Sequence, residues 1–361
     1  MNWNGKRVFL TGHTGFKGGW MSLWLQLQGS EICGYSLSPP ATTNLFEDAS
    51  VALGMHSVIG DIQDVSLLSS TMAAFRPEVV FHFAAQPLVR RSYRDPLGTY
   101  ATNVMGTANL LEAVRDTSVR AVVIVTSDKC YENREWDWSY GEVDRLGGYD
   151  PYSSSKACAE LIVSAYRNSF FNPSDYRSHG VALASVRAGN VIGGGDWAED
   201  RLVPDAMRAF AAGSPVRIRN PRAIRPWQHV LEPLRGYILL AESLCENGPR
   251  HGESWNFGPD PSGAQPVDWV LRELAASWGD GARWELESAA QPHEAQSLKL
   301  DCSKAAARLQ WRPQLPLRRA LEITVDWYRA KLHGEEMRAF TCNQIREYTS
   351  LTRSMATSVP A

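Results

Sequence analysis

The 361-residue chain has almost no net charge and no long apolar run. Lys and Arg number 37 against 39 Asp and Glu, so no basic field exists to attract nucleic acid or an anionic membrane, and we expect neither partner. The longest apolar candidates, residues 121–125 and 238–241, fall far short of the roughly 18 residues that cross a bilayer. Near the N-terminus only residues 8–10 are continuously apolar, too few for a signal-peptide core. We therefore expect a soluble, cytoplasmic protein.

Cysteine chemistry is equally sparse, because the chain has no C-x-x-C motif and no cysteine–histidine pair at zinc-ligand spacing. We expect no metal site, and we expect reduced thiols at Cys33, Cys130, Cys158, Cys245, Cys302 and Cys342. What the chain does contain is 44% hydrophobic and 10% aromatic residues. That composition is typical of a folded globular protein.

Short apolar runs alternate with amphipathic segments up to about residue 190. Trp20, Leu23, Trp24 and Leu27 have helical spacing, and Gly29 is placed to end that helix. Further helices are expected at 65–75, 103–114 and 153–171, and strands at 7–11, 31–36, 57–59, 78–84, 121–126 and 181–187. The alternation predicts an α/β fold, in which a doubly wound parallel sheet is covered by helices.

The pattern changes after residue 190, where stretches rich in Gly and Pro, such as 193–195 and 259–266, separate shorter helical pieces. A last amphipathic helix is expected near 317–328, and little apolar periodicity follows it. We therefore predict three parts: a dinucleotide-binding domain at 1–189, a smaller mixed substrate lobe at 190–341 whose segments can cross back, and a flexible tail at 342–361.

Three glycines spaced G-x-x-G-x-x-G follow the first predicted strand directly. In such a turn the first glycine permits the tight bend, the second admits a pyrophosphate, and the third lets the helix pack closely. The helix N-terminus then faces the phosphates. An ordinary strand–helix turn is the alternative, but the flanking strand and helix favour dinucleotide binding. The candidate residues are Gly12, His13, Thr14, Gly15, Phe16, Lys17 and Gly18.

The second predicted strand ends at residues 34–37 without the Asp or Glu that usually binds the ribose hydroxyls. His13 and Lys17 also bring positive charge near the phosphates, which either aids binding or competes with the nicotinamide cation. The residues alone therefore leave NAD and NADP open. Asp61 and Ile62 lie where an adenine amino group can be bound, and a helix N-cap region with Asp64 is the alternative.

Polar residues gather where the fifth predicted strand ends, at Ser127, Asp128 and Lys129. Tyr152 and Lys156 follow one helical turn apart. An ammonium beside a phenol favours the phenolate and lowers its pKa toward neutrality, so Tyr152 can act as a base. A surface pair at this spacing is the alternative reading. The combination of the Tyr152/Lys156 pair with the glycine turn and the polar strand end favours a catalytic role.

The glycine turn, the run 82–85, Asn103, Ser127 and the Tyr152/Lys156 pair resemble extended short-chain dehydrogenase/reductases that act on nucleotide sugars. The resemblance implies a Rossmann-type fold and NAD, with further cofactor contacts from Phe83, Ala84, Ala85 and Asn103. It covers nearly the whole chain. The long strings 127–133, 147–156, 187–197 and 225–230 resemble the 4,6-dehydratases of the family, which implies CDP-glucose as the substrate and a place in deoxysugar or O-antigen biosynthesis.

The resemblance also implies catalytic roles. Tyr152 takes the proton of the sugar C4 hydroxyl while hydride leaves for NAD⁺, with Ser127 bonded to the same oxygen and Lys156 on the ribose. Asp128 is the expected acid for the departing C6 hydroxyl. Lys129 stands where relatives have a glutamate base, so abstraction of the C5 proton requires a lowered lysine pKa. Electrostatic stabilisation of the enolate and a purely structural role are the alternatives.

A sugar-nucleotide diphosphate requires cations and fixed hydrogen-bond donors. Asn190 and Arg225 match family positions that meet the diphosphate, and Arg187, Arg201 and Arg222 are further candidates, each with a solvated or ion-paired alternative. His82, on an apolar strand, is expected to be a satisfied core residue rather than a ligand.

Two other functions fit the general motifs. An epimerase of the family keeps the tyrosine–lysine pair but lacks an acid/base pair after Ser127, and a non-catalytic dinucleotide sensor typically loses the tyrosine or the lysine. The dehydratase is therefore preferred. The resemblance also implies a homodimer, in which the helices expected at 103–114 and 153–171 pair with their copies.

Overall fold

The structure is a computed structural model that describes residues 1–39, 43–218, 220–279, 281–286 and 298–357. A seven-stranded sheet with the order β10-β6-β5-β4-β1-β2-β3 forms its centre, and every neighbouring pair is parallel. The strands are β1 (Arg7–Thr11), β2 (Glu31–Ser36), β3 (His56–Ile59), β4 (Val79–His82), β5 (Ala121–Val125), β6 (Ala182–Ala188) and β10 (Ser254–Phe257). The predicted fold class is confirmed, with the order of strands reversing between β1 and β4.

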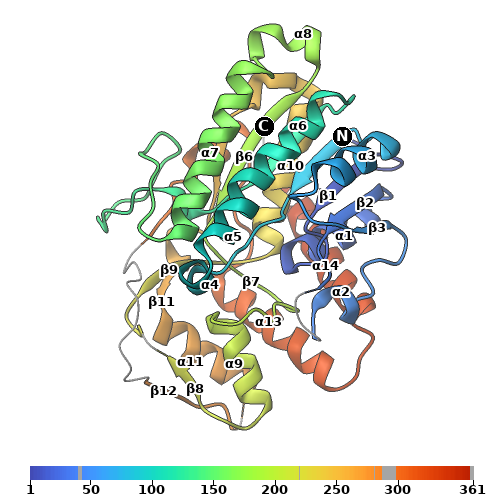
Figure 1. The fold of residues 1–361 in the computed structure, drawn as a ribbon. Coiled ribbons are helices and arrows are strands. Elements are labelled where there is room, and N and C mark those ends of the chain that lie inside the picture. Colours follow the sequence, from blue (N-terminus) through green and yellow to red (C-terminus); the bar gives the residue numbers. More distant parts are fainter. Residues whose placement is uncertain (40–42, 219, 280, 287–297, 358–361) are drawn as a thin grey trace.

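Helices cover both faces of the sheet (Figure 1). Along β1 the buried side chains alternate, because Val8 and Leu10 join one apolar cluster and Phe9 joins the other. The first cluster includes residues of α1 (Phe16–Leu27), α10 (Leu231–Asn247), α13 (Leu317–Leu332) and α14 (Met337–Thr357). The second includes residues of α3 (Val65–Phe75), α6 (Gly106–Arg115) and α7 (Pro151–Ser169).

Four short α-helices and a π-helical turn complete this part. The helix expected at 103–114 begins instead as a π-helix over Ala101–Met105, which α6 continues. The short helices near it are α4 (Val89–Arg94) and α5 (Pro96–Tyr100), with α8 (Tyr176–His179) at the far end of α7 and α2 (Leu45–Asp48) after β2. A π-helical turn inside a helix frequently marks a functional site.

The smaller lobe lies beyond the carboxyl ends of the strands (Figure 1). It holds a three-stranded sheet of β7 (Asn190–Ile192), β9 (Ile224–His229) and β11 (Ala264–Pro266), and a pair of β8 (Val216–Ile218) with β12 (Trp284–Leu286). Its helices are α9 (Leu202–Ala211) and α11 (Val267–Trp278), and α12 (Ser303–Arg308) packs near β10. Because β10, α10 and α13 rejoin the large sheet, chain segments cross between the two parts.

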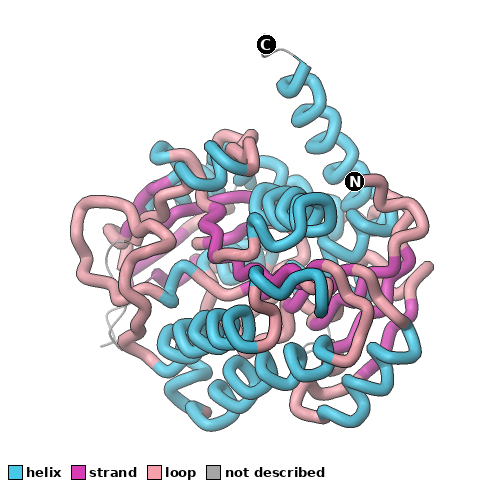
Figure 2. Tube along the Cα trace, turned by 90° about the horizontal axis from the view of Figure 1, so that it is seen from above, coloured by secondary structure: helices cyan, strands magenta, loops and turns pink. Residues whose placement is uncertain are grey.

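The end of the chain differs from the expected flexible tail. Residues 342–357 belong to α14, where Ile345 and Tyr348 are buried. Tyr348 donates a hydrogen bond to Glu232 Oε2 at 2.7 Å, and its ring meets Trp24 edge-on. This inward stripe holds the helix on the core, while its last turns project from the body (Figure 2). Residues 358–361 lie outside the described part of the chain.

All six cysteines are free thiols. No helix within the described ranges is long and apolar enough to cross a membrane. Among the same residues, no three His, Cys, Asp or Glu side chains are grouped so as to hold a metal ion. His82 is a satisfied core residue, as expected, because its Nδ1 lies 2.7 Å from Thr11 Oγ1 and its Nε2 3.3 Å from Thr107 Oγ1.

Candidate active site

The glycine turn between β1 and α1 leaves no room for side chains at two positions. Gly12 has a φ of +80°, and a Cβ there would lie 2.7 Å from the backbone nitrogen of Ala84. A Cβ on Gly18 would lie 2.1 Å from the carbonyl oxygen of Gly12. The N-cap residue of α1, Gly15, supplies no side-chain acceptor for the first N–H groups of the helix. These N–H groups suit the pyrophosphate of a dinucleotide, so the turn fits the expected cofactor.

The charge expected from the histidine of this turn is not present. Burial lowers the pKa of His13 to about 4, and its Nε2 lies 2.7 Å from Ser57 Oγ. His13 is therefore neutral near pH 7. Thr14 donates to the carbonyl of Leu37 at 2.9 Å, and its Oγ1 lies 2.8 Å from Ser36 Oγ. Hydroxyls thus occupy the end of β2, where the carboxylate is missing.

Lys17 keeps its charge more readily than His13, although burial, aided by Arg201 and Lys156, lowers its pKa to about 8. Its side chain lines the cavity that also contains Asp128. Phe16, the first residue of α1, packs against the main core. Lys17 is therefore placed to act on the substrate side, in addition to any effect on the phosphates.

The segment expected to bind adenine is partly engaged within the chain. Asp61 Oδ1 accepts the Gln63 N–H at 2.9 Å, which is a local contact within the turn before α3. The Ile62 carbonyl accepts from Asn109 Nδ2 at 3.1 Å, and its side chain lies under Gly106. The alternative of a helix N-cap region is realised by Asp64, which accepts the Leu67 N–H at 3.0 Å, while binding of Asp61 and Ile62 to adenine stays a prediction.

Phe83, Ala84 and Ala85 follow β4 beside the glycine turn, and the Ala84 N–H donates to Thr11 Oγ1 at 3.2 Å. Asn103, in the π-helical turn, brackets the adjacent Gln86: its Oδ1 accepts the Gln86 N–H at 2.8 Å and its Nδ2 donates to the Gln86 carbonyl at 3.1 Å. Nδ2 also donates to Ser155 Oγ at 2.8 Å. The amide of Asn103 therefore joins this loop to α7.

The polar end of β5 forms a tight 3₁₀ turn over Asp128–Cys130. Ser127 caps it, accepting the Lys129 N–H at 3.2 Å and donating to Asp128 Oδ1 at 3.0 Å. Asp128 is 3% exposed, and its Oδ2 has no hydrogen-bond partner. Burial raises the pKa of Asp128, although Lys129 and Ser127 oppose the rise. A carboxyl group with this surplus affinity for a proton is suited to be a general acid.

Tyr152 lies in the first turn of α7, which Asp150 caps by accepting the Ser153 N–H at 2.9 Å. The expected low pKa of the phenol is not found in the chain itself. Burial raises the pKa of Tyr152 to about 12, while the Ser127 hydrogen bond lowers it. Lys156 donates to the Val125 carbonyl at 3.2 Å, and burial lowers the pKa of its ammonium to about 8. Desolvation is thus the largest influence on the phenol, and Ser127 and Arg201 offset it only in part.

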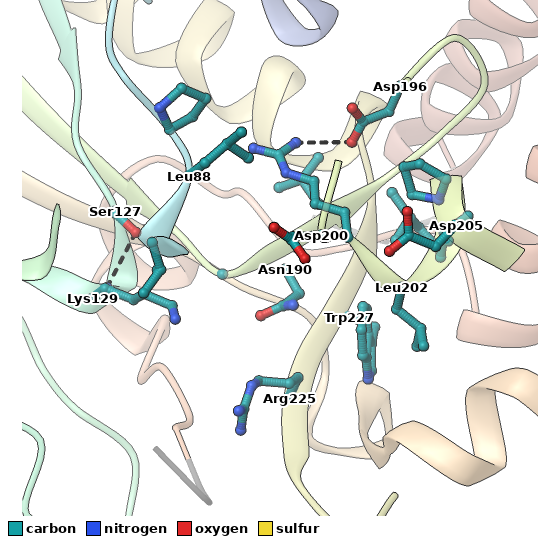
Figure 3. A pocket seen from close by; sticks show the side chains of 18 of the residues that line it. Leu88, Ser127, Lys129, Asn190, Asp196, Asp200, Leu202, Asp205, Arg225 and Trp227 are labelled. Carbon is teal, nitrogen blue, oxygen red and sulfur yellow. Dashed lines mark hydrogen bonds and ion pairs between the residues drawn. The ribbon is translucent and has the colours of Figure 1, made fainter. Parts of the chain in front are cut away.

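These side chains open onto one cavity of about 300 Å³ between the two parts of the molecule. Ser127 and Lys129 lie on one side, and Asn190, Arg225 and Trp227 lie across from them (Figure 3). The cavity unites most of the residues expected to act on the substrate, including Asp128, Tyr152 and Arg201. Arg222 is an exception, because it is exposed and does not line the cavity.

A family model described as the NAD dependent epimerase/dehydratase family matches residues 8–258. The chain belongs to this family. CDP-glucose 4,6-dehydratase of Salmonella typhimurium is 55% identical over 97% of this chain and 98% of its own length. The dTDP-glucose 4,6-dehydratase of Streptomyces antibioticus is 31% identical over 75% of this chain and 76% of its own. A Streptomyces venezuelae dTDP-glucose 4,6-dehydratase, solved with NAD bound, has a TM-score of 0.75 at 25% identity and covers 91% of this chain and 99% of that one.

Membership in the NAD dependent epimerase/dehydratase family confirms the resemblance read from the motifs, including the dependence on NAD. Several charged residues of the cavity were not among the predicted ones. Asp196 Oδ2 holds Arg201 at 2.8 Å, and Asp200 Oδ1 pairs with Arg90 at 3.3 Å. The three glycines before Asp196 could have indicated this part of the site, because a run of glycines is typical of places where two chain segments pass close to each other. Nothing in the sequence near Arg90 indicates its place at the cavity.

Arg187 was a candidate for the diphosphate, but it lies beneath the site rather than in the cavity. Its side chain is 3% exposed and makes an ion pair of 2.8 Å with Glu160. The alternative of an ion-paired arginine is therefore the correct one. Arg225 is 6% exposed and lines the cavity, as Arg201 does, so both arginines remain candidates for binding a phosphate group.

Proposed function

We propose that this chain converts CDP-glucose to CDP-4-keto-6-deoxyglucose and water. One observation carries the proposal: Ser127, Asp128, Lys129 and Tyr152 line a single cavity in a chain that is 55% identical to a CDP-glucose 4,6-dehydratase over 97% of its length. The reaction removes the C6 hydroxyl and the C5 proton as water. The hydride taken from C4 is then added at C6 while a proton is returned to C5, so no net oxidation of the sugar occurs.

The glycine turn and the start of α1 would hold the NAD pyrophosphate, with Lys156 at the nicotinamide ribose. When bound, NAD accepts hydride from C4 and later returns it to C6. Tyr152 takes the proton from the C4 hydroxyl, and the Ser127 hydroxyl bonds the same oxygen. Because burial raises the pKa of Tyr152 to about 12, its activation requires a positive charge beside it in the loaded enzyme.

A ketone at C4 makes the neighbouring C5 proton acidic. Lys129 lines the cavity beside Asp128, and we propose that its amine takes this proton. Asp128 then gives a proton to the departing C6 hydroxyl, since burial raises its pKa and favours the protonated form. Asp128 and Lys129 thus act as an acid and a base held by one turn.

The opposite wall of the cavity is suited to the nucleotide diphosphate. Asn190 and Arg225 lie across from the catalytic turn (Figure 3). An arginine guanidinium can donate two parallel hydrogen bonds to a phosphate, and the Asn190 amide supplies another donor. Arg201, which forms an ion pair of 2.8 Å with Asp196, supplies a second guanidinium group. We therefore assign diphosphate binding to Asn190, Arg201 and Arg225.

The test is to measure conversion over a panel of CDP-, dTDP-, UDP- and GDP-hexoses. The proposal predicts a 4-keto-6-deoxy product, with CDP-glucose as the substrate of highest kcat/KM. Formation of a C4 epimer in place of that product would contradict dehydration. A higher kcat/KM for another nucleotide would contradict only the assignment of the base.

We also propose a cytoplasmic homodimer that pairs through α6 and α7, which lie side by side on one flank of the molecule (Figure 1). Two large apolar side chains of this flank, Leu161 and Phe170, are 59% and 42% exposed. Pairing with a second copy would bury them. Sedimentation at micromolar concentration is expected to show a dimer, and a monomer alone would contradict the interface.

A further inference from the structure

A buried ion pair lies directly behind the catalytic turn. Glu160 on α7 meets Arg187 on β6 through two contacts, Nη2 to Oε2 at 2.8 Å and Nε to Oε1 at 2.9 Å. The two side chains are 1% and 3% exposed. Neither lines the cavity, so neither is placed to touch the substrate.

This ion pair is bonded to the chain on both sides of the catalytic turn. Before the turn, the Thr126 hydroxyl donates to Glu160 Oε1 at 2.5 Å. After the turn, Tyr131 Oη accepts from Arg187 Nη1 at 2.7 Å and donates to Asn256 Oδ1 at 2.8 Å. The residues between these two anchors are 127–130. Asp128 and Lys129 therefore lie between two residues, Thr126 and Tyr131, that are each hydrogen-bonded to the same ion pair.

The same pair also sets the position of Tyr152. Tyr152, Lys156 and Glu160 are spaced by four residues along α7, which places them on one face of the helix. Lys156 donates to the Val125 carbonyl at 3.2 Å, and Glu160 accepts from Thr126. The face of α7 that presents the tyrosine is thus bonded to the end of β5 at two successive residues.

We propose that the Glu160–Arg187 ion pair, acting through Thr126 and Tyr131, is a positioning device that holds the Ser127–Lys129 turn against Tyr152. This inference rests on the proposed dehydratase function. A displacement of about 1 Å within a catalytic constellation can cost about a hundredfold in rate. Release of either anchor should therefore lower kcat without disturbing the diphosphate wall, whose residues belong to other elements.

The experiment removes one hydroxyl at a time, because deleting a buried charge risks unfolding the protein. Thr126→Val cuts the first anchor, and Thr126→Ser keeps its hydroxyl. Tyr131→Phe cuts the second anchor. Tyr348→Phe is the matched control for Tyr131→Phe, since Tyr348 is also buried and its hydroxyl is also hydrogen-bonded, donating to Glu232 Oε2 at 2.7 Å. For each variant, kcat, KM for CDP-glucose and thermal stability are measured, with the active fraction determined by titration.

We expect Thr126→Val and Tyr131→Phe to lower kcat at least about tenfold, with KM within about twofold of wild type. Thr126→Ser should keep the kcat of wild type because it keeps the hydroxyl. Tyr348→Phe should be less stable than wild type but have the same kcat. If Tyr131→Phe behaves like Tyr348→Phe, or if only KM rises, the positioning role is contradicted while the proposed function stands. If wild-type protein forms no 4-keto-6-deoxy product, the proposed function fails and this inference fails with it.

Discussion

Replacing Arg187 with leucine should destabilise the folded protein through the carboxylate left behind. Glu160 is 1% exposed and would keep only hydroxyl donors, namely those of Thr126, Ser185 and Ser254. Removing one partner of a buried ion pair costs about 3–5 kcal/mol.

The pKa of Glu160 gives a similar magnitude. Burial by itself raises that pKa, but Arg187, aided by the hydroxyls of Thr126 and Ser185, overrides the effect and lowers it from 4.5 to about 2. At about 1.36 kcal/mol per pH unit, this fall corresponds to about 3 kcal/mol.

The pH dependence of this loss has a definite sign. In the wild type, the pKa of Glu160 lies below its unfolded value, so its contribution is present above about pH 4.5 and is lost as the pH falls toward 2. In Arg187→Leu, uncompensated burial places the same pKa above its unfolded value, and protonation then restores stability as the pH falls. The difference in stability between wild type and variant should therefore narrow from pH 8 to pH 5.

Urea denaturation followed by tryptophan fluorescence measures these differences. The double variant Glu160→Gln/Arg187→Leu should recover most of the stability lost in Arg187→Leu, because it no longer buries an unpaired charge. A double variant no more stable than Arg187→Leu would show that the loss does not come from an unpaired buried charge. A difference between wild type and Arg187→Leu that stays constant from pH 8 to pH 5 would show the same.

Three further variants test the site. Tyr152→Phe removes only a hydroxyl, so kcat should fall at least about a hundredfold while NAD binding, measured by calorimetry, stays near wild type; turnover like that of wild type would contradict the base. Lys156→Ala should weaken NAD binding and lower kcat together, and an unchanged NAD Kd would count against its contact with the ribose. Gly18→Ala places a Cβ 2.1 Å from the Gly12 carbonyl oxygen, so the turn must open and NAD binding should weaken while CDP binding persists; an unaltered NAD Kd would show that the turn does not hold the pyrophosphate.

The alternation of apolar runs and amphipathic segments was sufficient to predict the parallel sheet and most of its helices, because each signal is local. The edge strand β10 was not predicted, since its place beside β6 depends on a chain segment about 70 residues away. The helix α14 was taken for a tail, because only a narrow stripe including Ile345 and Tyr348 faces the core. Its stability depends on the surface it meets, which the sequence does not display.

For the site, motifs were informative where the chain itself places residues together. Ser127 to Lys129 share one turn, and Tyr152 with Lys156 share one helix face, so their common location could be predicted. Arginines could not be sorted by sequence, because Arg187 pairs with Glu160 and Arg222 faces solvent, whereas Arg225 lines the cavity. The charge of His13 also depended on burial that only the fold determines.

The central claim is that one site oxidises C4, eliminates water across C5 and C6, and returns the hydride to C6. CDP-glucose carrying deuterium at C4 tests it directly, with the product analysed by NMR. If the chain is a 4,6-dehydratase, we expect the label at C6 of a 4-keto-6-deoxy sugar and solvent hydrogen at C5. In Lys129→Met, exchange at C5 should be lost. Return of the label to C4 with the C6 hydroxyl intact would show epimerisation and contradict the account, and wild-type exchange at C5 in Lys129→Met would contradict the role of Lys129 as the base.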